Sequence, residues 1–345
     1  MIINAQQRER TGMEQVIRWG ILGTGKIAQA MAAALRDVPG AQLVAVASRT
    51  LESAERFGAL CDAPRRHASY QALADDAGVD VIYIATPHTL HAENALMCLA
   101  AGKHVVCEKP FTMNVREAQG VIELAREKKL FLMEAMWSRF LPAVLEARRL
   151  IASGEIGTVQ QLQADIGFVA NFPPEHRLLN PLLGGGALLD IGIYPLSMAA
   201  FFLGPVTQVR TLAEMGPTGV DEQAVFSLLH EGGGSSSCAC SMRVLSPTEL
   251  TITGTLGRIR LPGRFYKPDH LIIEPMDGER RVVDAPFIGN GYTHEAIEAM
   301  RCIRAGLLES PLMPHAETLA LMDVLDTMRA QVGLVYDADH ATAAA

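Results

Sequence analysis

The chain has 345 residues, of which 49% are apolar and 20% charged, and its 38 acidic residues outnumber the 30 basic ones to give a net charge of -8. This length is typical of two domains of about 150 residues each, and the composition excludes a disordered chain. Because nucleic acid and anionic lipid are bound by clustered Lys and Arg, the acidic balance also excludes them as main partners and favours a small-molecule ligand.

The first part of the chain, up to about residue 134, alternates short apolar runs with segments of helical length. Ile17–Leu22 is followed by Ile27, Met31 and Leu35 at helical spacing. Strands that alternate with helices form a parallel sheet covered on both faces, and right-handed crossovers make it doubly wound. The predicted strands are residues 17–22, 43–47, 80–85, 105–107 and 130–133.

After residue 154 the pattern changes to strand-like runs joined by Gly, Pro and Asp turns, which predicts a largely antiparallel sheet. We expect a hairpin loop at Gly232–Ser237 and a frayed tail at Ala341–Ala345. The predicted strands are residues 158–168, 206–213, 224–230, 235–244, 250–261 and 271–274, followed by helices over 293–306 and 315–332.

A glycine-rich segment lies between the first predicted strand and the first helix and fits the dinucleotide-binding fingerprint, with Ala28 in its third position. Gly23 permits the tight turn, Gly25 lets the backbone approach a pyrophosphate, and the helix N-terminus stabilises the anion. An ordinary tight turn is the alternative, and the α/β context favours the cofactor. The predicted cofactor residues here are Gly23, Thr24, Gly25, Lys26 and Ile27.

The end of the second predicted strand indicates which dinucleotide is preferred. NAD sites usually place Asp or Glu there, whereas this chain has Ser48, Arg49 and Thr50, which suit a 2'-phosphate. The alternative is that Arg49 stacks on the adenine and Ser48 caps a helix. We therefore predict NADP as the cofactor, with NAD possible.

Two further segments carry groups suited to proton transfer. Lys109 follows a predicted parallel strand, at the edge where such sheets bind ligands, although a surface lysine before Pro110 is the alternative. Asp190 and Tyr194 are four residues apart, so both would lie on one face of a helix. Alternatively, Asp190 caps a helix and Tyr194 is a core aromatic.

The sequence also carries signals that bear on where the protein resides in the cell. The first fifteen residues lack the apolar run of a secretion signal, and the longest uncharged apolar stretch, 191–206, is shorter than the roughly 18 residues of a membrane span. Cys238 and Cys240 are the only close pair among six cysteines and lack metal-ligand spacing. We expect a cytoplasmic protein with reduced thiols, no metal and no membrane contact.

The glycine fingerprint, Ala85-Thr86-Pro87, Glu108-Lys109-Pro110 and the Asp190 to Tyr194 pattern together resemble the family of glucose-fructose oxidoreductase, inositol dehydrogenase and rhizopine catabolism proteins (Gfo/Idh/MocA). The resemblance covers nearly the whole chain. The strings 134–140, 185–194 and 253–257 are most similar to its dimeric dihydrodiol dehydrogenases and NADP-dependent D-xylose dehydrogenases.

The resemblance implies an α/β chain with a dinucleotide-binding Rossmann domain over 1–138. A substrate-binding and oligomerisation α/β domain would follow over 139–345, with an open, mostly antiparallel sheet that forms a homodimer or homotetramer. It places Lys109 and Tyr194 over the nicotinamide, with Asp190 nearby and Glu108 orienting the ring. Many relatives carry His where this chain has Tyr194, so the proton donor here is phenolic. Residues implied to lie along the cofactor are Ala85, Thr86, Pro87, His88, Leu90 and His91.

The expected activity is hydride transfer between the nicotinamide cofactor and a secondary alcohol or carbonyl of a sugar or cyclic diol. Tyr194 would relay the proton, while Lys109 stabilises the alkoxide and favours tyrosinate. Asp190 either holds Lys109 or hydrogen-bonds the substrate. Alternatives are an anhydrosugar or dicarbonyl reductase, a noncatalytic NADP-sensing regulator, and a cofactor-bound scaffold. Other pocket candidates, left without assigned roles, are Trp137, Phe265, Tyr266, Arg139, Arg177 and His176.

Overall fold

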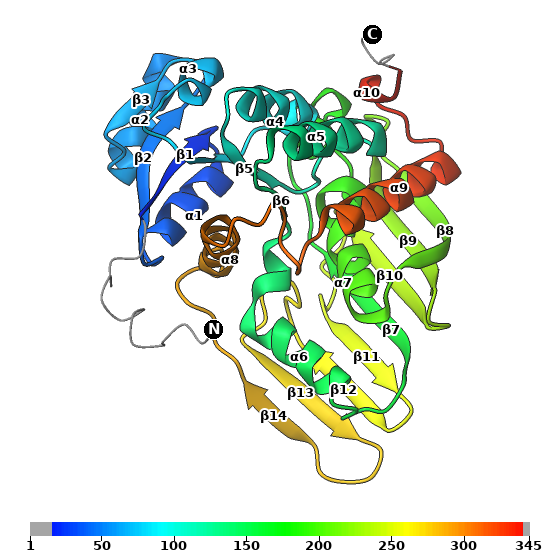
Figure 1. Cartoon of the computed structure of the whole chain (residues 1–345). Helices are drawn as coiled ribbons and strands as arrows, with labels where there is room; N and C mark the ends of the chain where they lie inside the picture. Colours follow the sequence, from blue (N-terminus) through cyan, green and yellow to red (C-terminus); the bar gives the residue numbers. More distant parts are fainter. Residues whose placement is uncertain (1–15, 341–345) are drawn as a thin grey trace, which may run out of the picture.

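The computed structural model describes residues 16–340, and its first half is a six-stranded parallel sheet with the order β3-β2-β1-β4-β5-β6 (Figure 1). The alternating pattern predicted this sheet, and the order reverses between β1 and β4. Ligands bind at such a switch point, beyond the carboxyl ends of the strands. The elements are β1 Ile17–Leu22, α1 Lys26–Leu35, β2 Ala41–Ala47, α2 Leu51–Cys61, β3 Arg65–His67, α3 Tyr70–Ala74, β4 Val81–Ile84, α4 His91–Ala100, β5 His104–Glu108, α5 Val115–Lys128 and β6 Leu132–Ala135.

The second half is built on an eight-stranded sheet with the order β14-β13-β12-β11-β7-β10-β9-β8, in which only β10 and β7 pair in parallel among the described strands. The prediction of a mostly antiparallel α/β domain is therefore confirmed. The elements are α6 Pro142–Ala152, β7 Val159–Gly167, α7 Ile193–Leu203, β8 Val206–Met215, β9 Asp221–His230, β10 Ser235–Ser241, β11 Leu250–Gly254, β12 Gly257–Leu261, β13 His270–Pro275, β14 Arg281–Asp284, α8 Thr293–Arg304, α9 His315–Val332 and α10 Asp337–His340.

One face of the eight-stranded sheet is covered by helices and the other is open. Along β9, Phe226 and Leu228 are buried while Val225 and Leu229 are exposed, which is the alternation of a sheet with one solvated face. Helix α7 packs on β7 and β10, and α9 packs on β8. Figure 1 shows these helices on one side of the sheet.

Several predicted boundaries were wrong. Residues 250–261 were predicted as one strand but form two, joined by a tight turn at Thr255 and Leu256. The turn was missed because Leu256 is apolar and continues the strand-like pattern. Only the glycines of Gly232–Ser237 lie in the hairpin turn, since β10 begins at Ser235. β6 begins two residues later than predicted, and the short edge strands β3 and β14 were missed. The predicted frayed tail at 341–345 and the first fifteen residues lie outside the described residues.

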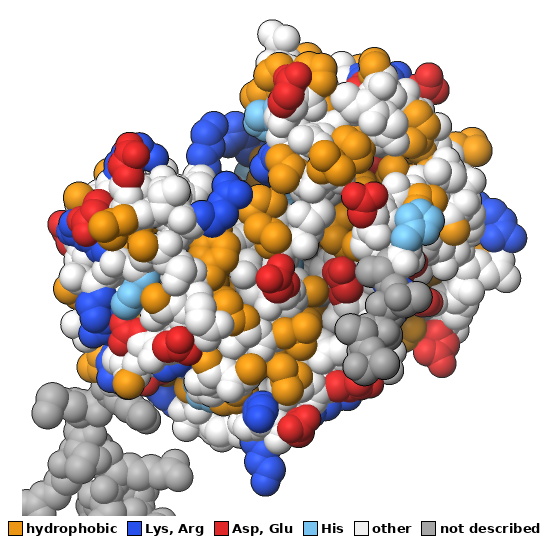
Figure 2. All heavy atoms as spheres, turned by 90° about the horizontal axis from the view of Figure 1, so that it is seen from above, with side chains coloured by type: hydrophobic (Ala, Val, Ile, Leu, Met, Phe, Trp, Pro, Cys, Tyr) orange, Lys and Arg blue, Asp and Glu red, His pale blue; other side chains and the backbone are white. Residues whose placement is uncertain are grey.

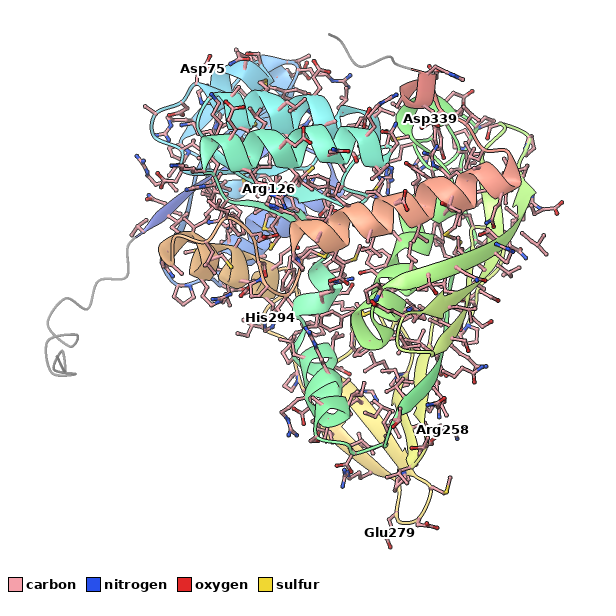
Figure 3. The ribbon with its side chains drawn as sticks, turned by 45° about the vertical axis from the view of Figure 1, so that its right-hand side comes forward. Asp75, Arg126, Arg258, Glu279, His294 and Asp339 are labelled. Atoms are coloured by element: carbon pink, nitrogen blue, oxygen red, sulfur yellow. The ribbon has the colours of Figure 1, made fainter. Side chains whose placement is uncertain are left out.

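The end of the chain returns to the first sheet. Helix α8 packs against α1 and against the 3₁₀ turn Trp137–Phe140, and α9 contacts both α5 and β8. Figure 3 shows α9 passing below the helix that carries Arg126 and reaching the second sheet, whose hairpin tip carries Glu279. The predicted domain boundary after residue 138 falls inside the 3₁₀ turn.

The apolar segment Pro181–Leu203 has 23 residues and overlaps the uncharged stretch 191–206. By length and composition it could span a membrane, but 89% of its most apolar 18 residues are buried within the fold, as in a core helix.

All six cysteines are buried, and none forms a disulfide. Within residues 16–340, no group of three His, Cys, Asp or Glu side chains is placed to hold a metal ion.

Candidate active site

A cavity of about 860 Å³ lies at the carboxyl ends of β1, β4 and β5 and is also lined by residues of the second sheet. Figure 2 shows Lys and Arg side chains gathered around a hollow in the face seen from above. The cavity contains most of the predicted site: Gly23, Thr24, Gly25, Lys26, Ile27, Ser48, Arg49, Ala85, Thr86, Pro87, His88, His91, Glu108, Lys109, Asp190 and Tyr194.

Two predicted cofactor residues do not line this cavity. Thr50 is the N-cap of α2, where its side chain accepts a hydrogen bond from the Ser53 backbone N–H at 3.3 Å. Leu90 ends the 3₁₀ turn His88–Leu90 that leads into α4. These residues shape the loops on either side of the cavity without lining it.

The glycine loop has the geometry that a dinucleotide pyrophosphate requires. At Gly23, φ is +104°, and a Cβ would lie 2.6 Å from the carbonyl oxygen of Ala85, so only glycine fits. A Cβ at Gly25 would meet nothing within 4 Å, so the space beside its backbone is open to a ligand. No described side chain caps the N-terminus of α1, so its N–H groups can bind an anion.

Lys109 connects the parallel sheet to the segment that carries Asp190. β5 ends at Glu108, and the Lys109 Nζ donates a hydrogen bond to the backbone oxygen of Asp190. The same Nζ is 3.5 Å from Asp190 Oδ1 and 4.8 Å from the ring centroid of Tyr194. The ammonium group is therefore held between the carboxylate and the face of the phenol.

Asp190 is a buried carboxylate that faces three basic side chains. Its Oδ1 lies 3.0 Å from Arg177 Nη1, 3.5 Å from Lys109 Nζ and 3.8 Å from His88 Nε2. Burial alone would raise the pKa of Asp190, but the charges of Lys109 and Arg177 outweigh it and hold the pKa well below its usual value. Burial lowers the pKa of His88 to about 3, so this imidazole is neutral. The Asp190 carboxylate thus accepts a hydrogen bond from Arg177 and lies next to the Lys109 ammonium group.

The segment between Asp190 and Tyr194 differs from the expected regular helix. Leu188–Gly192 forms a π-helical turn, and α7 begins at Ile193. Asp190 lies inside that turn and does not cap α7, yet both predicted side chains line the cavity. π-helical turns inside helices are frequent at functional sites.

Tyr194 is buried, and its hydroxyl oxygen accepts a hydrogen bond from Trp137 Nε1 at 3.0 Å. Burial and the nearby Glu108 carboxyl raise the pKa of Tyr194 well above its usual value. The phenol is therefore neutral in this structure, which differs from the expectation that Lys109 favours tyrosinate. The Lys109 ammonium group lies over the Tyr194 ring and donates a hydrogen bond to the backbone oxygen of Asp190.

The structure adds residues that sequence reasoning missed. Tyr292, which precedes α8, lines the cavity and stacks on Trp137 with ring centroids 4.2 Å apart. Glu295 is fully buried, and neither of its carboxylate oxygens has a hydrogen-bond partner among the described residues. Tyr83 donates a hydrogen bond to Glu108. No local motif marks these residues, because tertiary packing alone brings them to the site.

The remaining pocket candidates separate into two groups. Tyr266, Arg177 and His176 line the cavity, and His176 stacks on Phe172 with centroids 3.9 Å apart. Phe265 and Trp137 lie behind the lining, and Arg139 is fully buried with an ion pair to Glu317 at 2.7 Å. Arg139 is therefore a structural residue.

Comparison with known proteins agrees with this geometry. Residues 17–136 match the model of the oxidoreductase family with an NAD-binding Rossmann fold, and residues 144–260 match the GFO/IDH/MocA C-terminal domain. The chain therefore belongs to the Gfo/Idh/MocA family of oxidoreductases, which bind a nicotinamide dinucleotide.

Individual relatives extend over almost the full length. The chain is 39% identical to trans-1,2-dihydrobenzene-1,2-diol dehydrogenase of Danio rerio over 332 residues, which cover 94% of this chain and 99% of that protein. A 3-ketoreductase from Actinomadura kijaniata, solved with NADP, has a TM-score of 0.80 at 26% identity over 93% and 99% of the two chains. A levoglucosan dehydrogenase with NADH has the same fold, with a TM-score of 0.86 at 22% identity over 92% and 97%.

Proposed function

We propose that this oxidoreductase transfers hydride between NADP and a secondary alcohol of a cyclic trans-diol or a sugar ring. The arrangement of Lys109, Asp190 and Tyr194 at one end of a cavity that also contains the glycine loop carries the proposal. The name of the Danio rerio relative supports a cyclic diol as substrate, and those of the solved structures support sugars.

The residues of this chain supply proton transfer and orientation. The bound nicotinamide supplies hydride chemistry, while the glycine loop and α1 hold its pyrophosphate. Tyr194 is a neutral phenol in the cavity, so in reduction it gives its proton to the carbonyl oxygen and becomes tyrosinate. In oxidation the reverse step starts from tyrosinate, which takes the hydroxyl proton and becomes the neutral phenol. Lys109, fixed by Asp190, stabilises the negative charge that develops on that oxygen.

A panel of substrates tests this proposal. Purified protein is incubated with NADP or NAD and cyclic trans-diols, aldopyranoses or inositols, and with NADPH and dicarbonyls or anhydroketoses, while absorbance of the reduced nicotinamide is followed. We expect turnover with a diol or aldopyranose. Turnover confined to carbonyl substrates would favour the reductase alternative. NADP binding without any turnover would favour the sensing regulator, although the proton-transfer groups Lys109 and Tyr194 argue against that role.

Arg49 is the residue that we expect to select NADP. It is exposed at the cavity, directly after Ser48, where a 2'-phosphate would be recognised. Arg49→Ala should raise the KM for NADP about 10- to 100-fold, the effect of losing a charge-assisted hydrogen bond, and leave the KM for NAD within about twofold. Steady-state kinetics with each cofactor measure this.

The matched control for this prediction is Arg36→Ala, because Arg36 is exposed, pairs with Asp62 and does not line the cavity. It should leave both KM values unchanged. If the wild-type protein binds NAD more tightly than NADP, the preference inferred from Ser48 and Arg49 is wrong.

We also propose that the open face of the eight-stranded sheet forms the interface of a homo-oligomer. Leu212 is 75% exposed and pairs across the strands with the exposed Val225, and Leu229 lies on the same face. A second copy would cover this apolar face, since large exposed apolar patches are uncommon on monomers. Leu212→Asp should convert the oligomer to monomer in analytical ultracentrifugation.

A suitable control is Leu60→Asp, which places the same charge at another exposed leucine, on α2. This variant should retain the mass of the wild-type assembly. A monomeric wild-type protein at micromolar concentration would contradict the proposed interface.

A further inference from the structure

We propose that Trp137 is a positioning residue that directs the hydroxyl proton of Tyr194 toward the substrate oxygen. The inference rests on the proposed function, in which Tyr194 exchanges a proton with the substrate. Trp137 lies outside the cavity lining. Its contribution would be the 3.0 Å hydrogen bond from Nε1 to the Tyr194 hydroxyl oxygen.

The direction of this hydrogen bond is determined by chemistry. The indole N–H can only donate, so the Tyr194 oxygen must be the acceptor. The hydrogen of a phenolic hydroxyl prefers the ring plane, where it has two orientations, one on each side of the C–O bond. The Trp137 N–H occupies one of these two sides of the Tyr194 oxygen. The hydroxyl hydrogen therefore points away from Trp137. Without the indole donor, the hydroxyl hydrogen could adopt both orientations, and in one of them it would point away from the substrate oxygen.

The indole is held rigidly in this position. Trp137 is 3% exposed, stacks on Tyr292 at an interplanar angle of 18°, and meets Tyr266 edge-on at 6.3 Å. At Gly291 a Cβ would lie 2.9 Å from Trp137 Cζ3, so the backbone before α8 closes directly on the indole. The donor is thus fixed from several sides before any ligand arrives, which is the property of a preorganised site.

The hydrogen bond has a predictable effect on the ionisation of Tyr194. An N–H that donates to an oxygen favours its anionic form, so Trp137 lowers the pKa of Tyr194 and opposes burial, which raises it. Loss of the donor should therefore raise the pKa of Tyr194 and leave a smaller fraction of it ionised at a given pH during alcohol oxidation. The other titratable or charged groups that face Tyr194 are Glu108, Lys109, Asp190, Tyr266, Tyr292 and Glu295, and all of them remain in the Trp137 replacements below.

The test is Trp137→Phe, which keeps an aromatic ring against Tyr292 and removes the N–H. For carbonyl reduction with NADPH we expect kcat to fall about 10-fold or more, with the KM for substrate within about threefold, because a hydrogen bond is lost to the charge that develops on the Tyr194 oxygen as it gives up its proton. For alcohol oxidation, the rise of kcat/KM with pH should move by about one unit to higher pH. A structural role alone would not move this pH dependence.

A replacement that matches the shape of the indole separates the hydrogen bond from packing. Site-specific replacement of Trp137 by benzothienylalanine keeps the shape of the indole and replaces N–H by sulfur. It should reproduce the shift in the pH dependence without changing the packing of the site. This second replacement decides the question if Trp137→Phe does not fold.

A double-mutant comparison distinguishes this inference from the proposed function. In a Tyr194→Phe background, Trp137→Phe should cause no further loss of kcat. If Tyr194→Phe abolishes turnover but the Trp137 replacements leave kcat and the pH dependence unchanged, the positioning role is wrong and the proposed function stands. If Tyr194→Phe retains full turnover, both are wrong.

Discussion

Tyr194→Phe should lower kcat for alcohol oxidation by a factor on the order of 10² to 10⁴, the usual contribution of a positioned proton donor or acceptor. Tyr194 is the phenol at the Lys109 end of the cavity, and removing its hydroxyl leaves the cavity wall and the glycine loop intact. The dissociation constant for NADP should therefore stay within about twofold of the wild-type value. Initial-rate kinetics and a fluorescence titration with NADPH measure the two quantities.

Tyr70→Phe is the matched control, because this tyrosine also lines the cavity but lies in the field of Arg49 and not of Lys109. It should retain kcat. An unchanged kcat in Tyr194→Phe would remove this residue from the proton transfer and leave its burial as a purely structural property.

Lys109→Met should lower kcat by about 10² to 10³-fold, because it removes the cation that stabilises charge on the reacting oxygen. It also leaves Asp190 with one fewer cation, so the pKa of Asp190 should rise from its depressed value. Activity that depends on ionised Asp190 would then be lost at a higher pH than in the wild-type protein as the pH falls. The measurement is the pH dependence of kcat and of kcat/KM.

Lys109→Arg should not restore the activity, since a planar guanidinium cannot take the place of the compact ammonium between Asp190 and the Tyr194 ring. Lys128→Met, at a partly exposed lysine near the end of α5, is the neutral control. A variant that raised only KM and kept kcat would show that Lys109 contributes binding and no transition-state stabilisation.

The fold could be predicted where local pattern and tertiary structure agree. β1, β2 and β4 are apolar runs separated by helices, so their alternation identified the parallel sheet. β3 was missed because its three residues, Arg65–His67, are polar and only pair with the edge of β2. A strand of this kind is defined by its neighbour and has no hydrophobic period of its own.

The site was predictable where a residue's position in an α/β sheet already determines its surroundings. The glycine loop and Lys109 follow strands whose carboxyl ends meet at one edge, so their proximity could be inferred. The protonation of Tyr194 could not, because it depends on Glu108 and Glu295, which come from separate elements. The Trp137 to Tyr194 hydrogen bond likewise joins residues 57 positions apart.

The return of α8 to the first sheet has a consequence for how the protein is made. During translation the parallel sheet emerges first, but α8 is among the last segments to leave the ribosome. Until then α1 lacks the helix that covers it, and Trp137 lacks its stacking partner Tyr292. The nascent cofactor-binding half is therefore incomplete, and the active site is complete only after α8 has been made.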